Sequence, residues 1–80
     1  LIELYLRGGA DAVFLDLYTL DVQPVAELIE DYNVPAGYAE YYWDKTAPGQ
    51  ELSPGTYYMV AFIYKGDRAE GWILDEVVVP

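Results

Sequence analysis

The stretch Gly37–Tyr64, GYAEYYWDKTAPGQELSPGTYYMVAFIY, decides the fold of this chain. Two runs within it, Tyr38–Trp43 and Thr56–Tyr64, are rich in the aromatic and β-branched residues that favour partly buried strands. The segment between them contains Pro48-Gly49 and Pro54-Gly55, and proline followed by glycine supplies the fixed φ and then the positive φ of a tight turn. The stretch therefore predicts two strands at the centre of a β-sandwich, and it contains no catalytic motif.

The rest of the chain reads as further strands. Leu1–Arg7 alternates apolar and polar residues, which is typical of a half-buried strand. Asp11–Leu20 is largely apolar on both faces, so we expect it to be central or covered on both sides. Gly66-Asp67 predicts a hairpin turn into a last strand, Arg68–Val79, in which Gly71 is a candidate β-bulge.

One segment, Gln23–Asp31, fits two structures. Pro24 suits the first turn of a helix, and Val25, Leu28 and Ile29 would share a helical face. A short edge strand that tolerates Pro24 at its start is the alternative, and we favour it because strands surround the segment. About seven short strands separated by turns predict a single domain, residues 1–80, with the fold of an immunoglobulin-like antiparallel β-sandwich.

Composition excludes several classes of partner. The chain has 80 residues, a hydrophobic fraction of 54% and a formal net charge of −10, which argues against nucleic acid. Only Arg7, Lys45, Lys65 and Arg68 are basic, and they do not cluster. No apolar run approaches the roughly 20 residues of a membrane-spanning helix, so membrane insertion is not expected. The chain opens in a strand without methionine, which indicates a mature, processed or excised product.

The residues that most enzymes use are missing. The sequence has no histidine and no cysteine, and therefore lacks the usual general base, thiol nucleophile and soft-metal ligands. Ser53 is the only serine, lies in a Pro-Gly turn and has no histidine to activate it. We predict that the protein is not an enzyme and that it has no catalytic residues and needs no cofactor.

A set of motifs resembles a known family. Leu28-Ile29, Val34–Tyr38, Trp43-Asp44, Gly49 and Leu52–Tyr57 together resemble the immunoglobulin-like domain of the flagellar hook-capping family. Related C-terminal domains of secreted bacterial proteins include sorting modules, so the resemblance implies an extracellular or cell-surface location. It implies structural roles in turns and core packing, and no shared catalytic residue, for Gly37, Trp43, Gly55 and Tyr57. The chain departs from the family pattern at residues 45–48.

Acidic residues near the expected loops are candidate ligands for calcium, a cation that prefers oxygen ligands. Their spacing matches no EF-hand or repeat motif, so a solvated acidic surface that keeps the protein soluble is the competing interpretation. The candidate metal ligands are Asp44, Glu51, Asp67 and Glu70.

The nine tyrosines allow a carbohydrate-binding interpretation, because aromatic rings stack on sugars. Tyr38, Tyr42, Tyr58 and Tyr64 would form a platform if they shared one outer face. The competing interpretation is that tyrosines pair across strands, with the ring buried and the hydroxyl in water.

The surplus of apolar residues predicts an interface. Large exposed apolar patches mark contact sites, and exposed edge or terminal strands can pair with a neighbour. We predict a structural subunit that packs against copies of itself in a surface fibre, tube or layer. The alternatives are an accessory or sorting module packed against a sister domain of a longer secreted protein, and a carbohydrate-binding module. The candidate interface residues are Leu1, Ile2, Leu4, Tyr42, Tyr58, Tyr64, Val77 and Val79.

Overall fold

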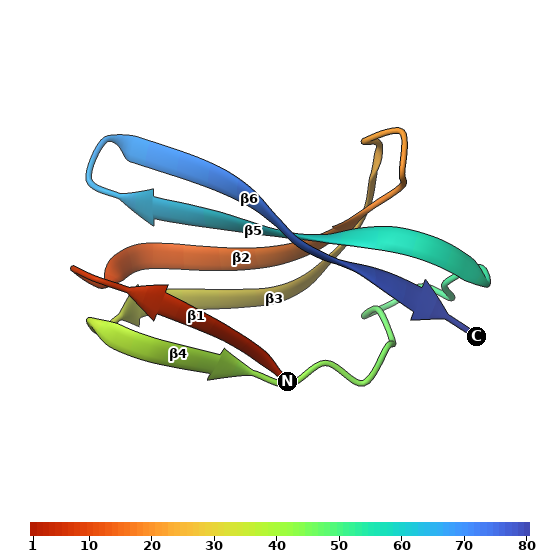
Figure 1. The fold of residues 1–80 in the computed structure, drawn as a ribbon, viewed down its shortest axis with the longest axis horizontal. Coiled ribbons are helices and arrows are strands. Elements are labelled where there is room, and N and C mark those ends of the chain that lie inside the picture. Colours follow the sequence, from red (N-terminus) through yellow and green to blue (C-terminus); the bar gives the residue numbers. More distant parts are fainter.

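A computed structural model describes all residues from Leu1 to Pro80, and its regular structure is entirely β-strand (Figure 1). The predicted all-β antiparallel sandwich is confirmed: six strands form two antiparallel sheets. No helix is long and apolar enough to cross a membrane. The strands are β1 (Ile2–Leu6), β2 (Ala10–Tyr18), β3 (Pro24–Val34), β4 (Gly37–Tyr41), β5 (Gly55–Lys65) and β6 (Arg68–Val79).

The larger sheet has the strand order β3-β2-β5-β6 (Figure 1). The two strands with apolar residues on both faces, β2 and β5, are its central pair, as the sequence predicts for the segment that forms β2. Gly66, at φ 60°, begins the predicted two-residue turn between β5 and β6, which matches the preference of type II′ hairpins for glycine at the first turn position.

The ambiguous segment is a strand, and its helix-like spacing has a physical cause. The register between β2 and β3 shifts twice. At each shift β3 contains one residue, Leu28 or Val25, that has no partner on β2, which makes it a β-bulge. As a result Val25, Leu28 and Ile29 all pack against the core although they do not alternate strictly. The bulges thus produce a pattern in β3 that also fits one face of a helix.

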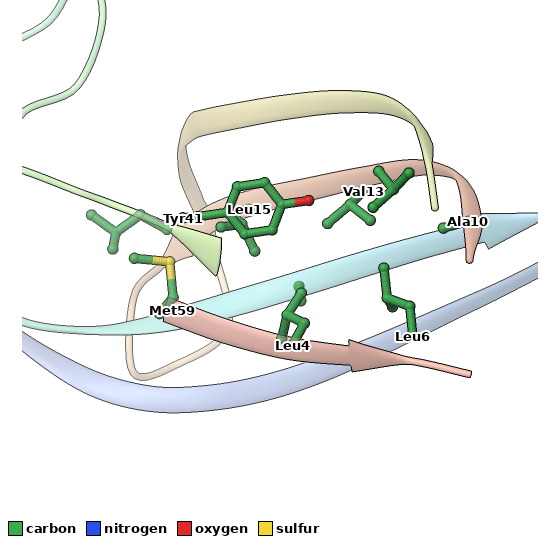
Figure 2. Packing of buried hydrophobic residues seen from close by; sticks show 10 residues of the cluster. Leu4, Leu6, Ala10, Val13, Leu15, Tyr41 and Met59 are labelled. Atoms are coloured by element: carbon green, nitrogen blue, oxygen red, sulfur yellow. The ribbon is translucent and has the colours of Figure 1, made fainter. Parts of the chain in front are cut away.

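The smaller sheet pairs β1 with β4 and packs on one face of the larger sheet (Figure 1). Figure 2 shows Leu4 and Leu6 of β1 pointing toward Val13 and Leu15 of β2 in the core between the two sheets. This arrangement follows from period-2 alternation, since every second residue of each strand faces the opposite sheet. Every fully buried residue of the chain is apolar or, in the case of Tyr41, aromatic with a polar tip.

Tyr41 fixes β4 above β3. Its hydroxyl donates a hydrogen bond of 2.9 Å to Oδ2 of Asp31 on β3. Burial, together with the hydrogen bond to Asp31 and the charge of that carboxylate, raises the pKa of Tyr41 to about 12. β1 lies beside β4 in the smaller sheet. Since β4 lies above β3, at one edge of the larger sheet, β1 lies toward β5 and β6.

The structure has six strands rather than about seven, and the segment between β4 and β5 forms turns, as predicted. Ala47 and Gln50 make only an isolated bridge around Pro48-Gly49, and Gly49 has the positive φ, 71°, that a Pro-Gly turn requires. The indole Nε1 of Trp43 donates to the carbonyl oxygen of Thr46 at 2.8 Å, while the ring packs against the core. β4 therefore ends at Tyr41, two residues earlier than predicted.

The predicted bulge at Gly71 is wrong. Gly71 pairs regularly with Phe62, and the extra residue of β6 is Leu74, between the pairs Val60–Ile73 and Met59–Asp75. A side chain at Gly71 would meet the Phe62 ring at 3.1 Å, so the glycine makes room for that ring. The bulge at Leu74 changes the alternation of β6 and turns Val77 and Val79 toward the core.

The molecule is more extended than its size requires. Its accessible surface is 5338 Å², compared with roughly 4,900 Å² expected for a compact protein of this mass. Its radius of gyration is 12.7 Å, compared with about 11.6 Å expected for 80 residues. Both differences have the same cause: a two-stranded sheet covers only part of one face of a longer, four-stranded sheet.

We predict that Gly9→Ala destabilises the fold by about 2–4 kcal/mol. Gly9 has a φ of 73°, and an added Cβ would lie 2.6 Å from the carbonyl oxygen of Val34. Gly49→Ala is the matched control, because Gly49 has nearly the same φ, 71°, with no atom within 4 Å of the added Cβ. It should cost only about 1–2 kcal/mol of backbone strain. Urea unfolding of both variants measures the difference, and equal losses would contradict the predicted clash.

Candidate interaction surfaces

The largest uncovered surface is the face of the four-stranded sheet that points away from β1 and β4. We call it the outer face. The strand register places the alternate residues of each strand there, opposite those that form the core. No strand covers this face. Its residues include Ala12, Phe14, Asp16 and Tyr18 of β2, Glu27, Glu30 and Tyr32 of β3, Tyr58, Val60, Phe62 and Tyr64 of β5, and Gly71, Ile73, Glu76 and Val78 of β6.

Aromatic rings on the outer face contact one another at an angle. Phe14 lies between Tyr32 and Tyr64, with ring centroids 5.8 Å and 5.3 Å away and interplanar angles of 81° and 66°. Tyr18 and Phe62 are 6.0 Å apart and tilted by 50°. Edge-to-face pairs of this kind are favourable aromatic geometries. They also make the surface corrugated rather than flat.

A shallow apolar cleft of about 230 Å³ opens on the β5–β6 side of the outer face. The absence of a side chain at Gly71 leaves space next to the Phe62 ring. Beside the cleft, the side chain of Ile73 is 60% exposed, and Val22 at the tip of the β2–β3 turn is 61% exposed. This half of the outer face thus combines a depression with protruding apolar groups.

Asp16 is a carboxylate placed among the apolar residues of the outer face. Its Oδ1 atom is buried and has no hydrogen-bond partner. Burial, together with the negative charges of Glu27 and Glu30 on β3, raises the pKa of Asp16 to about 6. The sequence alone does not reveal this group, because the two glutamates come beside Asp16 only through the register of β2 and β3.

The predicted interface residues do not form one surface. Tyr58 and Tyr64 lie on the outer face, whereas Leu1 and Tyr42 are exposed elsewhere. The other four contribute to the core of the chain itself, and among them Leu4 and Val79 are buried. The terminal strands therefore stabilise this molecule first, and their inward side chains reach a neighbour only if a strand is exchanged. The half-buried pair are Ile2 and Val77.

The four tyrosines of the predicted sugar platform lie on two different sheets. Tyr58 and Tyr64 belong to the outer face of the larger sheet. Tyr38 lies on the outward side of the smaller sheet, where its ring contacts Tyr5 at 5.0 Å with a tilt of 56°. Tyr42 follows the end of β4. The structure does not bring these four rings together.

The four predicted metal ligands are also separated. Asp44 and Glu51 line one cleft beside the β4–β5 segment, whereas Asp67 and Glu70 lie in and next to the hairpin at the other end of β5. Asp44 accepts hydrogen bonds from the amide and hydroxyl of Thr46, which lower the pKa of Asp44 and fix the local turn. The chain contains no group of three or more acidic residues close enough to hold one metal ion.

The basic residues do cluster in space, contrary to the sequence prediction. Arg7, Lys65 and Arg68 line one cleft of about 690 Å³ together with Tyr5, Leu6, Ile63, Glu70 and Trp72, and we call it the basic cleft. Two contacts hold its walls together: the Lys65 ammonium group donates to the carbonyl oxygen of Gly8, and the amide of Gly66 donates to Asp11 at 2.6 Å. The fourth basic residue, Lys45, lies in a different cleft.

The chain matches no protein-family model and no curated protein sequence. The resemblance to the hook-capping family therefore stays a prediction, and the candidate surfaces are interpreted from their own geometry.

We predict that Asp16→Asn stabilises the fold at neutral pH and has little effect at pH 4. The pKa of Asp16 is about 6 in the folded protein and 3.8 in the reference state, so the folded state holds this proton more tightly than the unfolded chain. The resulting cost is absent below about pH 4, grows as the pH rises from about 4 to about 6, and is complete above that. After allowance for solvent screening, we expect a gain of about 1 kcal/mol at pH 7.5.

Chemical unfolding of Asp16→Asn at pH 4 and pH 7.5 measures this effect. The control is Glu51→Gln, which removes the same charge from an exposed loop residue. A gain that is equal in the two variants, or equal at the two pH values, would show that net charge rather than the burial of Asp16 is responsible.

Proposed function

We propose that this protein is a non-catalytic interaction module that self-associates through the outer face, as a structural subunit of an assembly outside the cell. The observation that carries the proposal is the outer face itself: it is rich in aromatic and aliphatic residues, and no strand covers it. Monomeric proteins rarely leave large apolar surfaces in water, and such surfaces mark contact sites. The extracellular location rests on the resemblance noted in the sequence.

The chemistry of the outer face favours a protein partner. The tilted rings of Phe14, Tyr64 and Phe62 provide no flat stacking platform for a sugar. Aromatic and aliphatic groups that form ridges and a shallow cleft are instead typical of the central part of protein interfaces. The absence of histidine and cysteine from the sequence supports a role without catalysis.

Charge placement determines how two copies can meet. Three carboxylates of the outer face, Asp16, Glu27 and Glu30, lie on β2 and β3. The β5–β6 half carries one, Glu76, opposite Tyr58 toward the end of β6, and its Phe62–Ile73 part is apolar. If two copies overlap around a two-fold axis through the Phe62–Ile73 part of their β5–β6 halves, the carboxylates of β2 and β3 stay at the rim in water. Complete overlap would instead bring the acidic rows together at a cost in Coulomb energy.

The size of the face sets the expected affinity. Four strands about 4.8 Å apart and roughly nine residues long offer a plane of about 19 by 30 Å. Each partner in a standard protein interface buries about 800 Å², so even complete overlap only approaches that size. Overlap of one half predicts weak association, with a dissociation constant of about 10–100 μM, which becomes effective at high local concentration.

We predict that Tyr64→Ser and Ile73→Ser each weaken self-association by about tenfold, because each removes an apolar side chain from the contacting half. Sedimentation equilibrium between about 5 and 500 μM measures the dissociation constant. The matched control is Tyr38→Ser, which removes one member of an exposed tyrosine pair from the smaller sheet.

Two results would contradict the proposal. One is a wild-type chain that stays monomeric at the highest concentration, which would favour packing of the outer face against another domain of a longer protein. The other is a Tyr38→Ser variant that weakens association as much as Tyr64→Ser does, because the contact would then not be specific to the outer face.

A further inference from the structure

The smaller sheet has a free edge beside an uncovered part of the larger sheet. β1 pairs with β4 on one side only, and β4 lies above β3 through the Tyr41–Asp31 hydrogen bond. The other edge of β1 therefore faces the side of β6. There the indole of Trp72, on the inward side of β6 opposite Ala61, is 56% exposed because no strand lies above it.

Two clefts follow this edge of β1, and residues of β1 and β6 line both of them. The first, of about 390 Å³, lies between the start of β1 and the Leu74–Val77 part of β6. The second is the basic cleft, between the end of β1 and the Arg68–Trp72 part of β6. The strands run in opposite directions past these clefts, so the depression extends along the whole of β1. Its apolar lining includes Ile63, Leu74 and Trp72. The first cleft also contains Glu3, Lys45 and Asp75, so its charges do not favour an acidic ligand and only the basic cleft does.

The charge of the basic cleft is unusual for this protein. The chain carries 14 acidic and four basic residues, and three of the four basic residues line this one cleft. Arg68 forms the only ion pair of the chain, a 3.8 Å contact with Glu70 between exposed side chains. Arg7 and Lys65 have no carboxylate within ion-pair distance. Glu70 offsets part of this charge, and a cleft that stays net positive in a strongly acidic protein is complementary to an acidic ligand.

We propose that the free edge of β1 and the basic cleft bind an extended acidic peptide segment as an additional strand of the smaller sheet. Main-chain hydrogen bonds to β1 would supply affinity for any extended segment. Alternate side chains of the segment would point down onto the apolar lining near Trp72 and Leu74. Acidic side chains at one end would contact Arg7 and Arg68, which selects against basic segments.

Two ligands could pair with the free edge of β1: a single extended segment, or the β1 edge of a second folded copy. The topology favours the single segment. In each molecule β5 and β6 extend beyond β1 on the side of its free edge. If two copies paired through β1 about a two-fold axis, their β6 strands would occupy the same space under the joined sheets. A single extended segment avoids this collision, and this surface is separate from the outer face.

The test uses three capped six-residue peptides added to the isotope-labelled protein. The first alternates valine with glutamate or aspartate, the second has lysine in place of each acid, and the third is the acidic peptide with a central proline. We expect the acidic peptide alone to shift the Trp72 indole resonance. It should also slow hydrogen exchange at alternate amides of β1, because those amides gain hydrogen-bond partners.

Substitutions locate the site. Arg7→Ala and Arg68→Ala should each weaken binding of the acidic peptide by about three- to tenfold, and added salt should weaken it further. The control is Gln23→Glu, which lowers the net charge by one as each arginine substitution does. Gln23 lies in the β2–β3 turn and lines neither cleft, so the affinity should change much less. All three side chains are exposed, so the fold should tolerate each substitution.

Several results would overturn the proposal: no binding at millimolar peptide, equal binding of the lysine peptide, or equal binding of the proline peptide. Displacement of the peptide by millimolar acetate would mean that the basic cleft takes small anions rather than a strand. The Tyr64→Ser variant separates this inference from the proposed self-association, because it should leave peptide binding unchanged.

Discussion

The two-stranded sheet can cover only one face of the four-stranded sheet, and the exposed surfaces of this molecule follow from that constraint. β2 and β5 carry apolar side chains on both faces, yet β1 and β4 cover only one of them. Burial of apolar surface contributes roughly 25 cal/mol per Å², so the covered side supplies most of the hydrophobic stabilisation. The uncovered side is where an additional partner would gain the most. The chain has only 80 residues and no disulfide, so its stability depends mainly on this one core. No second layer of strands buries the outer face to add to it.

Negative charge limits what the apolar surfaces can do. Asp16 places a poorly solvated carboxylate among the rings of the outer face, next to the row of acids on β3. On the smaller sheet, Glu3 and Glu40 are direct cross-strand partners, a like-charge pair that weakens the β1–β4 ribbon. Core packing of Leu4 and Leu6 must hold that ribbon in place. The same charges that oppose tight association also keep an apolar protein soluble as a single chain.

The sequence predicts the strands well where one physical rule applies, and poorly where two rules compete. The inward alternation of Val13, Leu15 and Leu17 and the central place of their strand follow from period-2 patterning alone. The segment after Pro24 is ambiguous locally, because β-bulges imitate helical spacing, and only its pairing with β2 decides. A glycine within a strand marks either a bulge or a ring that needs space. Gly71 is the second case, which cannot be known until Phe62 is placed opposite it.

Surfaces are harder to predict than strands, because they join residues from distant parts of the chain. Arg7 and Lys65 are far apart in sequence, and they share the basic cleft only because the turn after β1 contacts the β5–β6 hairpin. The acidic and aromatic outer face and the basic edge of β1 lie on opposite sides of the larger sheet. A partner on one therefore does not block the other, and their opposite charges select different ligands. If both proposed contacts form, they would give one subunit two non-equivalent contacts, as an extended assembly requires, whereas a single two-fold contact would end at a dimer.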